Sequence, residues 1–300
     1  MASVVEIPDP ASLSAERRIE LQKALEQGRI LYFPRSPIAI EPDDRTFLLG
    51  LRQSGAAYHK NIAYRPESNR VTGFAAESAG DSARLRAVLR RYSRDSIAFL
   101  AALFPSYGAA WKVDYASFRA LEEAGRDLSP AKKNDLMHVD AFPTRPTRGD
   151  RILRFFTNVN PSEDRHWKTG TDVFPALAER YAASSGLLGK AVRGGAAAKA
   201  RSWAAAAGLP VAAQSAYDRF MLGFHDYLKG NAEYQREART DEFRFPPGSA
   251  WMVFTDTVSH AVLSGRFALE QTFLIRRASL ALPESAPIAV LEKLAGRALA

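Results

Sequence analysis

The sequence contains no cysteine among its 300 residues. This absence excludes disulfide bonds, thiolate metal sites, iron–sulfur clusters and cysteine nucleophiles, so any metal held by the protein must be bound by histidine or by carboxylates. Histidine is also scarce, with five residues in the whole chain. The candidate imidazole ligands are therefore His59, His138, His166, His225 and His260.

Long apolar runs are missing as well. No segment approaches the roughly 18 apolar residues of a membrane-spanning helix. The N-terminal segment MASVVEIPDPASLSAERRIE lacks a basic stretch followed by an apolar one, as a secretory signal would have. We therefore expect a soluble cytoplasmic protein. Its 41 lysines and arginines exceed its 33 acidic residues, and the resulting net charge of +8 favours anionic partners, although an arginine-rich coding habit explains it equally well.

Hydrophobic spacing divides the chain into helical and extended regions. Residues 13–29 and 81–104 have the apolar repeat of helices, which end at Gly28 and before Pro105. The strand-like segments are residues 30–34, the alternating stretches WKVDYASFRAL and RILRFFTNVNP, and two or three more within EFRFPPGSAWMVFTDTVSHAVLSGRFALEQTFLIRRASL. Residues 172–235 between them are alanine-rich and helical in character. We predict an α+β fold with a β-rich core that is split by helices.

His138 and Asp140 lie between two predicted strands. In an extended segment, residues i and i+2 project to the same side, so an imidazole and a carboxylate can face one point. A second histidine would complete a 2-His-1-carboxylate facial triad, which suits Fe(II) that must also bind a co-substrate and O₂. A His-x-Asp pair is common by chance, and on its own a solvated loop explains it better. His260 changes this, because it follows one predicted strand and precedes a Gly265-Arg266 turn into another.

Two segments resemble the 2-oxoglutarate-dependent oxygenases. The segment FPPGSAWMVFTDTVSHAVLSGRFALEQTFLI looks like the C-terminal half of their double-stranded β-helix, and LMHVDAFPTRPTRGDRILRFFTNVNP looks like the proximal half. The resemblance implies a single domain over residues 1–300 with a double-stranded β-helix (jelly-roll) core. Its expected parts are an N-terminal helical and strand layer at 1–110, core strands at 111–170 and 240–280, and a helical insert between the two halves at 172–235.

The segment NDLMHVDAFPTRPTRGDRILRFFTNVNP, followed by Arg165-His166-Trp167, is similar to the Kdo hydroxylases. These bacterial enzymes hydroxylate the 3-position of Kdo in Kdo-lipid A and convert that sugar to Ko. The resemblance implies Fe(II), 2-oxoglutarate and O₂, with succinate and CO₂ as co-products. It also implies a glycolipid substrate at the cytoplasmic leaflet of the inner membrane, which the protein would contact peripherally without spanning it.

The family's functional residues map onto five positions of this sequence. The expected metal ligands are His138, Asp140 and His260. Arg266 is the expected partner of the 5-carboxylate of 2-oxoglutarate, since a guanidinium can pair with a carboxylate through two hydrogen bonds, although in many relatives that cation lies about ten residues after the distal histidine. Asn158 is expected to face the same co-substrate. Because Arg266 lies six residues after His260, three other arginines stay open for its role: Arg276, Arg154 and Arg119.

The segment after the His-x-Asp pair carries a cluster of three arginines, Arg145, Arg148 and Arg151. Kdo has a carboxylate and lipid A has phosphates, so the resemblance makes this cluster a candidate cationic rim, with Arg145 and Arg148 as the expected substrate contacts. A solvated cationic loop is the alternative. Arg165 and Trp167 are further candidates for the neighbourhood of the substrate or the metal.

The three remaining histidines have plainer expected roles. His225 is expected to have a packing or surface role within the helical insert, and His166 to lie in a loop. His59, which Lys60, Arg65 and Arg70 accompany, is expected in a solvated loop, or else at an anion-binding entrance. For the insert itself we predict a lid or a substrate-shaping role.

Three other functions stay open. A basic nucleic-acid-binding protein would show a recognition helix or interleaved aromatic and basic residues, and here the basic residues are dispersed, so we expect no nucleic-acid partner. A non-catalytic jelly-roll binding module of the cupin kind would need a close His-x-His pair, which the sequence lacks. A 2-oxoglutarate oxygenase of another substrate, such as a small metabolite, a protein or a nucleic acid, would keep the same metal ligands.

Overall fold

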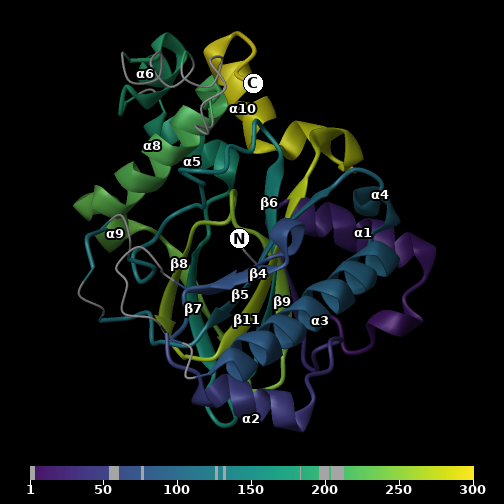
Figure 1. Cartoon of the computed structure of the whole chain (residues 1–300). Helices are drawn as coiled ribbons and strands as arrows, with labels where there is room; N and C mark the ends of the chain where they lie inside the picture. Colours follow the sequence, from purple (N-terminus) through teal and green to yellow (C-terminus); the bar gives the residue numbers. More distant parts are fainter. Residues whose placement is uncertain are drawn as a thin grey trace.

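Two β-sheets form the centre of the molecule, with helices packed around them (Figure 1). The computed structural model describes residues 4–53, 61–75, 78–125, 128–130, 133–182, 184–195, 203 and 213–300. His59 and Lys60, for which we predicted a loop, lie outside the described residues. Of the helices within these ranges, none is both long and apolar enough to cross a bilayer.

The larger sheet has eight strands. Their spatial order is β1 (Val4–Glu6), β2 (Ile30–Phe33), β9 (Ala250–Phe254), β6 (Arg151–Asn158), β11 (Ala268–Ile275), β5 (Lys112–Arg119), β3 (Ile62–Arg65) and β4 (Arg70–Thr72). The smaller sheet consists of β10 (His260–Ser264), β7 (Arg165–Gly170) and β8 (Thr240–Phe245). Neighbouring strands run antiparallel in both sheets, except for the parallel pair β1 and β2.

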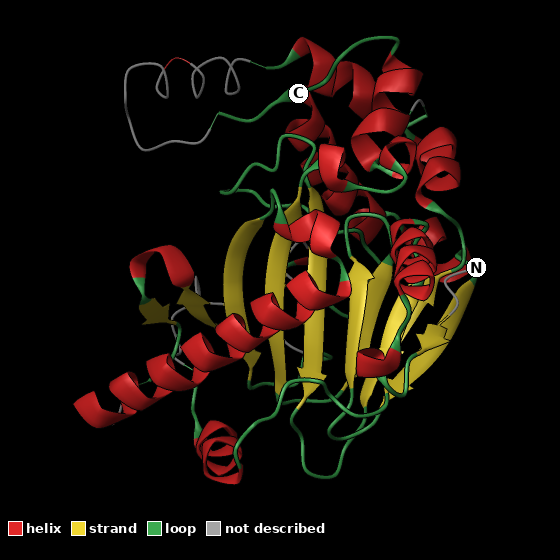
Figure 2. Ribbon diagram, turned by 90° about the vertical axis from the view of Figure 1, so that its right-hand side faces the viewer, coloured by secondary structure: helices red, strands yellow, loops and turns green. Residues whose placement is uncertain are grey.

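Helices cover one face of the larger sheet and one end of the molecule. The N-terminal helices are α1 (Ala15–Glu26), α2 (Pro42–Gly50), α3 (Ala79–Leu103) and α4 (Pro105–Gly108); the later ones are α5 (Phe174–Tyr181), α6 (Leu187–Arg193), α8 (Ala216–Gly230), α9 (Ala232–Glu237) and α10 (Pro287–Ala295). Helix α3 lies across the strands in Figure 2 and buries Leu85, Val88, Leu89 and Tyr92 at helical spacing. Helices α5, α6 and α8 gather near α10 at the opposite end (Figure 1).

The predicted α+β class is confirmed, and the predicted helices 13–29 and 81–104 correspond to α1 and α3. Two local predictions need correction. The C-terminal segment forms four strands, β8 to β11, rather than two or three. His166 lies in strand β7 and not in a loop, because the polar run around it alternates between buried and half-buried positions and pairs with β8 on one side and β10 on the other.

The predicted turn at Gly265 joins β10 to β11 and requires glycine. Its φ of +99° lies in the region that side chains rarely adopt, and a Cβ there would come within 2.5 Å of the Asp164 carbonyl oxygen. This close approach lets the chain reverse directly beside strand β7. Strand β11 consequently enters the larger sheet between β5 and β6.

Candidate metal centre

His138, Asp140 and His260 meet in space, although they lie far apart in sequence. Each offers one ligand atom, and these atoms all lie within 4.8 Å of one another. Backbone hydrogen bonds hold the two segments together: His138 N–H donates to His260 O over 3.1 Å, and His260 N–H donates to His138 O over 2.8 Å. The Asp140 N–H donates to Thr255 O over 2.8 Å. The positions of the three side chains are therefore fixed by the sheet framework.

Both imidazoles present the same ring nitrogen to the centre. The Nδ1 of His138 lies 2.7 Å from Leu136 O, and the Nδ1 of His260 lies 2.8 Å from Val258 O. A carbonyl can only accept, so each Nδ1 carries the hydrogen and each Nε2 keeps its lone pair for a metal. Burial lowers the pKa of both rings, that of His138 well below its usual value, so both are neutral at physiological pH.

Asp140 is held ionised and oriented by Arg154. The Arg154 Nε lies 2.8 Å from Asp140 Oδ2, while Oδ1 lies 3.7 Å from His138 Nε2. Burial alone would raise the pKa of Asp140, but the charge of Arg154 beside it holds that pKa well below its usual value. Two neutral imidazoles and one carboxylate are the donor set of a 2-His-1-carboxylate iron site, so the residues present fit Fe(II).

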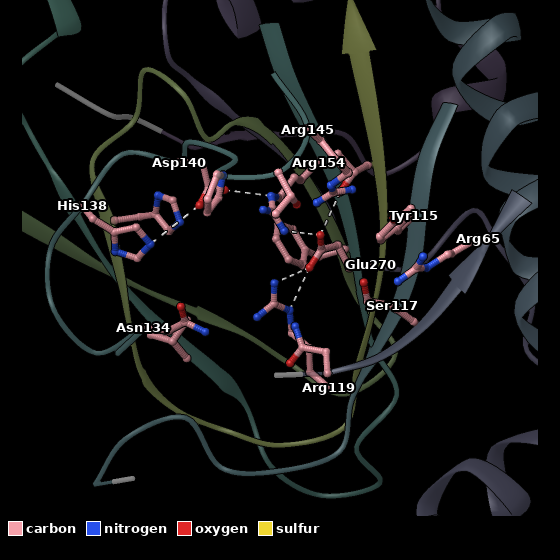
Figure 3. A pocket seen from close by; sticks show the side chains of 18 of the residues that line it. Arg65, Tyr115, Ser117, Arg119, Asn134, His138, Asp140, Arg145, Arg154 and Glu270 are labelled. Atoms are coloured by element: carbon pink, nitrogen blue, oxygen red, sulfur yellow. Dashed lines mark hydrogen bonds and ion pairs between the residues drawn. The ribbon is translucent and has the colours of Figure 1, made fainter. Parts of the chain in front are cut away.

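A cavity of about 420 Å³ opens over these three side chains. Its lining includes four arginines, Arg65, Arg119, Arg145 and Arg154, together with Glu270 (Figure 3). The indole of Trp167 is also part of the wall and stacks on the His260 ring, with centroids 5.1 Å apart and planes 14° from parallel. The cavity therefore combines a metal-binding corner with an aromatic wall and several cations.

Glu270 gathers two of these arginines deep in the cavity. Its carboxylate accepts from the Nε of Arg119 over 2.8 Å and is also ion-paired with Arg154. Burial would raise the pKa of Glu270, but the two arginines lower it to about 2. Arg119 also bonds Glu123 over 3.1 Å. The strand register explains the cluster, because Glu270 lies opposite Ser117 and Phe156, and Arg119 and Arg154 are the diagonal neighbours on the same face.

The two predicted co-substrate contacts lie outside this cavity. Arg266 is exposed and its guanidinium rests on Phe267, 4.2 Å from the ring centroid. Asn158 is buried, and its side-chain amide forms hydrogen bonds with three backbone groups. It donates to Glu163 O and Phe245 O and accepts from Asn160 N–H. Of the three alternatives, Arg154 and Arg119 line the cavity, and Arg276 does not.

Of the two predicted substrate contacts, Arg145 and Arg148, the structure places one in the cavity and one outside it. Arg145 lines the cavity, where its guanidinium is ion-paired with Asp114. Arg148 is exposed and lies outside the lining, with a left-handed backbone at φ 53° and an N–H that donates to Asp218 Oδ1 over 3.0 Å. Arg65, expected with His59 in a solvated loop or at an anion-binding entrance, lies in strand β3 on the cavity wall. Sequence reasoning missed Tyr115 and Asn134 among the lining residues. Strand alternation, which puts Tyr115 on the same face as Arg119, pointed to the first of them alone.

The helical insert packs against the loop that carries His138 and Asp140. The Gln235 side chain bonds both backbone groups of Met137, with 2.9 Å for each bond. His225 packs in the insert as predicted, with Nδ1 2.8 Å from Val139 O and its ring edge-on to His138 at a centroid distance of 4.9 Å. Asp218 accepts the N–H of Thr147 over 2.8 Å. The insert thus supports the metal-ligand loop from behind.

Replacing Gln235 with leucine is expected to weaken metal binding about tenfold, the low end of the effect of removing groups that orient metal ligands. The Met137 backbone next to His138 would lose its partners for both N–H and C=O. Anaerobic titration with Co(II), beside a melting temperature, measures the change. Gln27→Leu removes an exposed amide outside the cavity and is the control. Equal Co(II) affinity in both variants would contradict the supporting role of Gln235.

The comparisons with known proteins agree with this site. Residues 9–298 match the family described as 3-deoxy-D-manno-oct-2-ulosonic acid (Kdo) hydroxylase. No match is found among curated proteins. Solved structures of the Kdo hydroxylase KdoO, described as a non-heme Fe(II) α-ketoglutarate-dependent dioxygenase, are similar over nearly the whole chain.

Three KdoO structures illustrate the similarity. The complex with α-ketoglutarate and Fe(III) is 33% identical, covers 99% of this chain and 97% of its own, and has a TM-score of 0.84. The apo structure is 34% identical over the same shares, with a TM-score of 0.85. The complex with succinate and Fe(III) is 33% identical over the same shares, with a TM-score of 0.83. The resemblance predicted from the His-x-Asp and His260 segments is confirmed, and this chain belongs to the Kdo hydroxylase family of non-haem Fe(II)/2-oxoglutarate-dependent dioxygenases.

Proposed function

We propose that the protein hydroxylates the 3-position of Kdo in Kdo-lipid A, converting that sugar to Ko, and that His138, Asp140 and His260 hold the iron. One observation carries the assignment: the buried two-histidine, one-carboxylate cluster opens into a cationic cavity in a chain whose family match spans residues 9–298. Cations suit a sugar that bears a carboxylate.

The test is reconstitution without oxygen, with Fe(II), 2-oxoglutarate and a Kdo-lipid A glycolipid, followed by exposure to O₂. We expect succinate release and a mass increase of one oxygen atom on the Kdo unit. If succinate formed with a nucleoside, peptide or small metabolite but never with a Kdo glycolipid, the proposed substrate would be wrong and the oxygenase chemistry would stand. No succinate with any of them, despite confirmed iron binding, would remove the oxygenase assignment.

We also propose that the two sheets are the two halves of a double-stranded β-helix within a single domain over residues 1–300. The core strands would come from residues 111–170 and 240–280, with residues 1–110 as the outer layer and 172–235 as the insert. The cavity favours this arrangement, because its wall includes Arg119 and Arg154 from the larger sheet and Trp167 and His260 from the smaller one. A single cooperative unfolding transition is expected, and two separate transitions would contradict the single domain.

The residues of the chain divide the work of the reaction. Bound iron and 2-oxoglutarate supply the oxidising chemistry, in which O₂ is consumed and an unactivated C–H bond becomes C–OH, with succinate and CO₂ as co-products. The Nε2 atoms of His138 and His260 and the Oδ1 of Asp140 would hold the metal on one side. Arg154 keeps Asp140 ionised and turned toward the two rings. Trp167 shields the His260 side of the site from water.

For the 5-carboxylate of 2-oxoglutarate we propose the pair Arg119 and Arg154 in place of Arg266. Both line the cavity, and Glu270 holds them together at the position ten residues after His260, where many relatives have the cation itself. In this chain an acidic residue at that position would fix two cations from the neighbouring strands. Two guanidinium groups offer the fork geometry that a carboxylate prefers.

Arg119→Gln is expected to raise the KM for 2-oxoglutarate about tenfold or more, because a charge-assisted hydrogen bond is worth about 1.5–3 kcal/mol. Arg266→Gln, which removes an exposed guanidinium outside the cavity, is expected to leave that KM unchanged. Both are measured by succinate release at saturating Fe(II), with the Co(II) affinity recorded to check that the metal site is intact. The reverse order of effects would return the role to Arg266.

We further propose that the protein reaches its substrate from the cytoplasmic side, in peripheral contact with the inner membrane. A net charge of +8 favours an anionic leaflet, and Trp203, 79% exposed, is a side chain of the kind that lies at bilayer interfaces. Co-sedimentation with vesicles of anionic phospholipid, and none with neutral vesicles, is the expected result. Absence of binding to either would contradict the membrane contact.

A further inference from the structure

Strand alternation in the β3–β5 pair sends one row of side chains into the cavity. Ile62 and Tyr64 of β3 are buried in the hydrophobic core, so Ala63 and Arg65 between and after them face the other way and line the cavity. In the register, Ala63 lies opposite Ser117 of β5. Two residues further along β3, Arg65 therefore comes beside Tyr115.

Tyr115 lies between two guanidinium groups. The guanidinium carbon of Arg145 is 4.1 Å from the centroid of the Tyr115 ring, and that of Arg65 is 5.1 Å from it. Arg145 also contacts the ring of Phe142, with 4.2 Å from its guanidinium carbon to the ring centroid. Figure 3 shows this group on the side of the cavity away from His138. We call Arg65, Tyr115 and Arg145 the arginine–tyrosine clamp.

The four arginines that line the cavity differ in whether they form an ion pair with a carboxylate. Arg119 and Arg154 are paired with Glu270, and Arg145 is paired with Asp114. Among the residues that the structure describes, no carboxylate forms an ion pair with Arg65, whose guanidinium lies over the Tyr115 ring. The clamp thus brings two cations to one ring with a single acidic side chain beside them.

The surrounding side chains match a sugar. Near the clamp the cavity wall carries amides and hydroxyls, namely Asn61, Thr72, Ser117 and Thr144. Such groups bond to the hydroxyls of a carbohydrate, and an aromatic ring beside them packs on its C–H face. An anionic group on that sugar would meet the unpaired charge of Arg65.

We propose that the arginine–tyrosine clamp is the anion-binding part of the substrate site, and that Arg65 makes the charge-assisted hydrogen bonds to a carboxylate or phosphate of the glycolipid. Asp114 and Tyr115 hold Arg145 in place as the second cation. The clamp lies on the side of the cavity away from His138, so an anionic group bound there leaves the metal corner to the carbon that reacts. This inference rests on the proposed function, because it concerns the substrate of the same cavity.

The test compares Arg65→Gln with Arg70→Gln. Arg70 is the cross-strand partner of Arg65 in β4, is exposed and does not line the cavity, so its loss changes the net charge equally. Arg65→Gln is expected to raise the KM for the Kdo glycolipid about tenfold or more, with Arg65→Lys recovering part of the loss. The Co(II) affinity and the KM for 2-oxoglutarate should stay unchanged. Equal KM values for the glycolipid in Arg65→Gln and Arg70→Gln would overturn the proposal.

A substrate treated with phosphatase identifies the anion. If the penalty of Arg65→Gln persists on the dephosphorylated glycolipid, Arg65 binds a carboxylate; if it disappears, Arg65 binds a phosphate. Either result supports the clamp. Equilibrium binding of the Kdo glycolipid to the wild-type protein loaded with Co(II) and 2-oxoglutarate separates the two levels of the hypothesis. Wild type that binds metal but neither binds nor hydroxylates the glycolipid overturns the proposed function, whereas wild type that binds the glycolipid only as tightly as Arg65→Gln does overturns only the clamp.

Discussion

His138→Ala is expected to abolish succinate formation and to weaken binding of Fe(II) or Co(II) by more than about 100-fold. Removal of outer partners of metal ligands alone costs about 10–100-fold in affinity, and this variant removes a ligand itself. The buried neutral ring of His138 is one of only three donors that meet in the described cluster, so the loss leaves two. Anaerobic metal titration followed by a single-turnover succinate assay measures both effects.

His166→Ala is the matched control for that experiment. His166 lies on strand β7 next to Trp167, but its Nε2 is 2.9 Å from the exposed Glu242 and its ring is not among the clustered ligands. Its removal should change neither metal affinity nor turnover. If His138→Ala kept the metal affinity of the wild type, the iron assignment would be wrong even if activity were lost.

Glu270→Gln is expected to destabilise the fold by about 3–5 kcal/mol at pH 7, the usual cost of removing one partner from a buried ion pair. Arg119 would remain buried, and Arg154 with a side chain only 12% exposed, with one charge fewer to balance them. Chemical denaturation of the metal-free protein gives the free energy of unfolding. Glu242→Gln, an exposed glutamate that pairs with His166, should change it by less than about 1 kcal/mol.

The pH dependence gives this prediction a second signature. The pKa of Glu270 is lowered from 4.5 to about 2 in the folded protein, so its carboxylate stabilises the fold above the pKa of the unfolded chain. That contribution is lost as the pH falls through the window between these two values. The difference in stability between wild type and Glu270→Gln should therefore shrink below pH 4.5, and a difference that stays constant to pH 3 would contradict the ionised Glu270 cluster.

The cluster of candidate metal ligands was predictable because local geometry and one long-range match were enough. The i, i+2 spacing of His138 and Asp140 puts both side chains on one side of an extended segment, whatever the rest of the chain does. His260 needed only the strand pattern around it and the Gly265 turn. The family resemblance then linked the two segments. In the structure, two backbone hydrogen bonds between His138 and His260 join them.

The arrangement of the charged side chains in the cavity was not predictable in the same way. Arg119, Arg154 and Glu270 come from three strands that are distant in sequence and become neighbours only through the sheet order β6-β11-β5. A shift of one residue in either register would turn these side chains to the other face. Arg266 was favoured because it is near His260 in sequence, but the positive-φ turn at Gly265 leaves it exposed on the outside.

The sequence by itself determined the chemical class of this protein: the absence of cysteine left imidazole and carboxylate as metal donors, and the family resemblance of the two segments implied Fe(II) and 2-oxoglutarate. Only the tertiary structure decided which arginines share the cavity with the three candidate metal ligands. Sequence spacing fixes side chains within one strand, whereas a charge cluster across strands depends on pairing register, and the register is set by how both sheets pack.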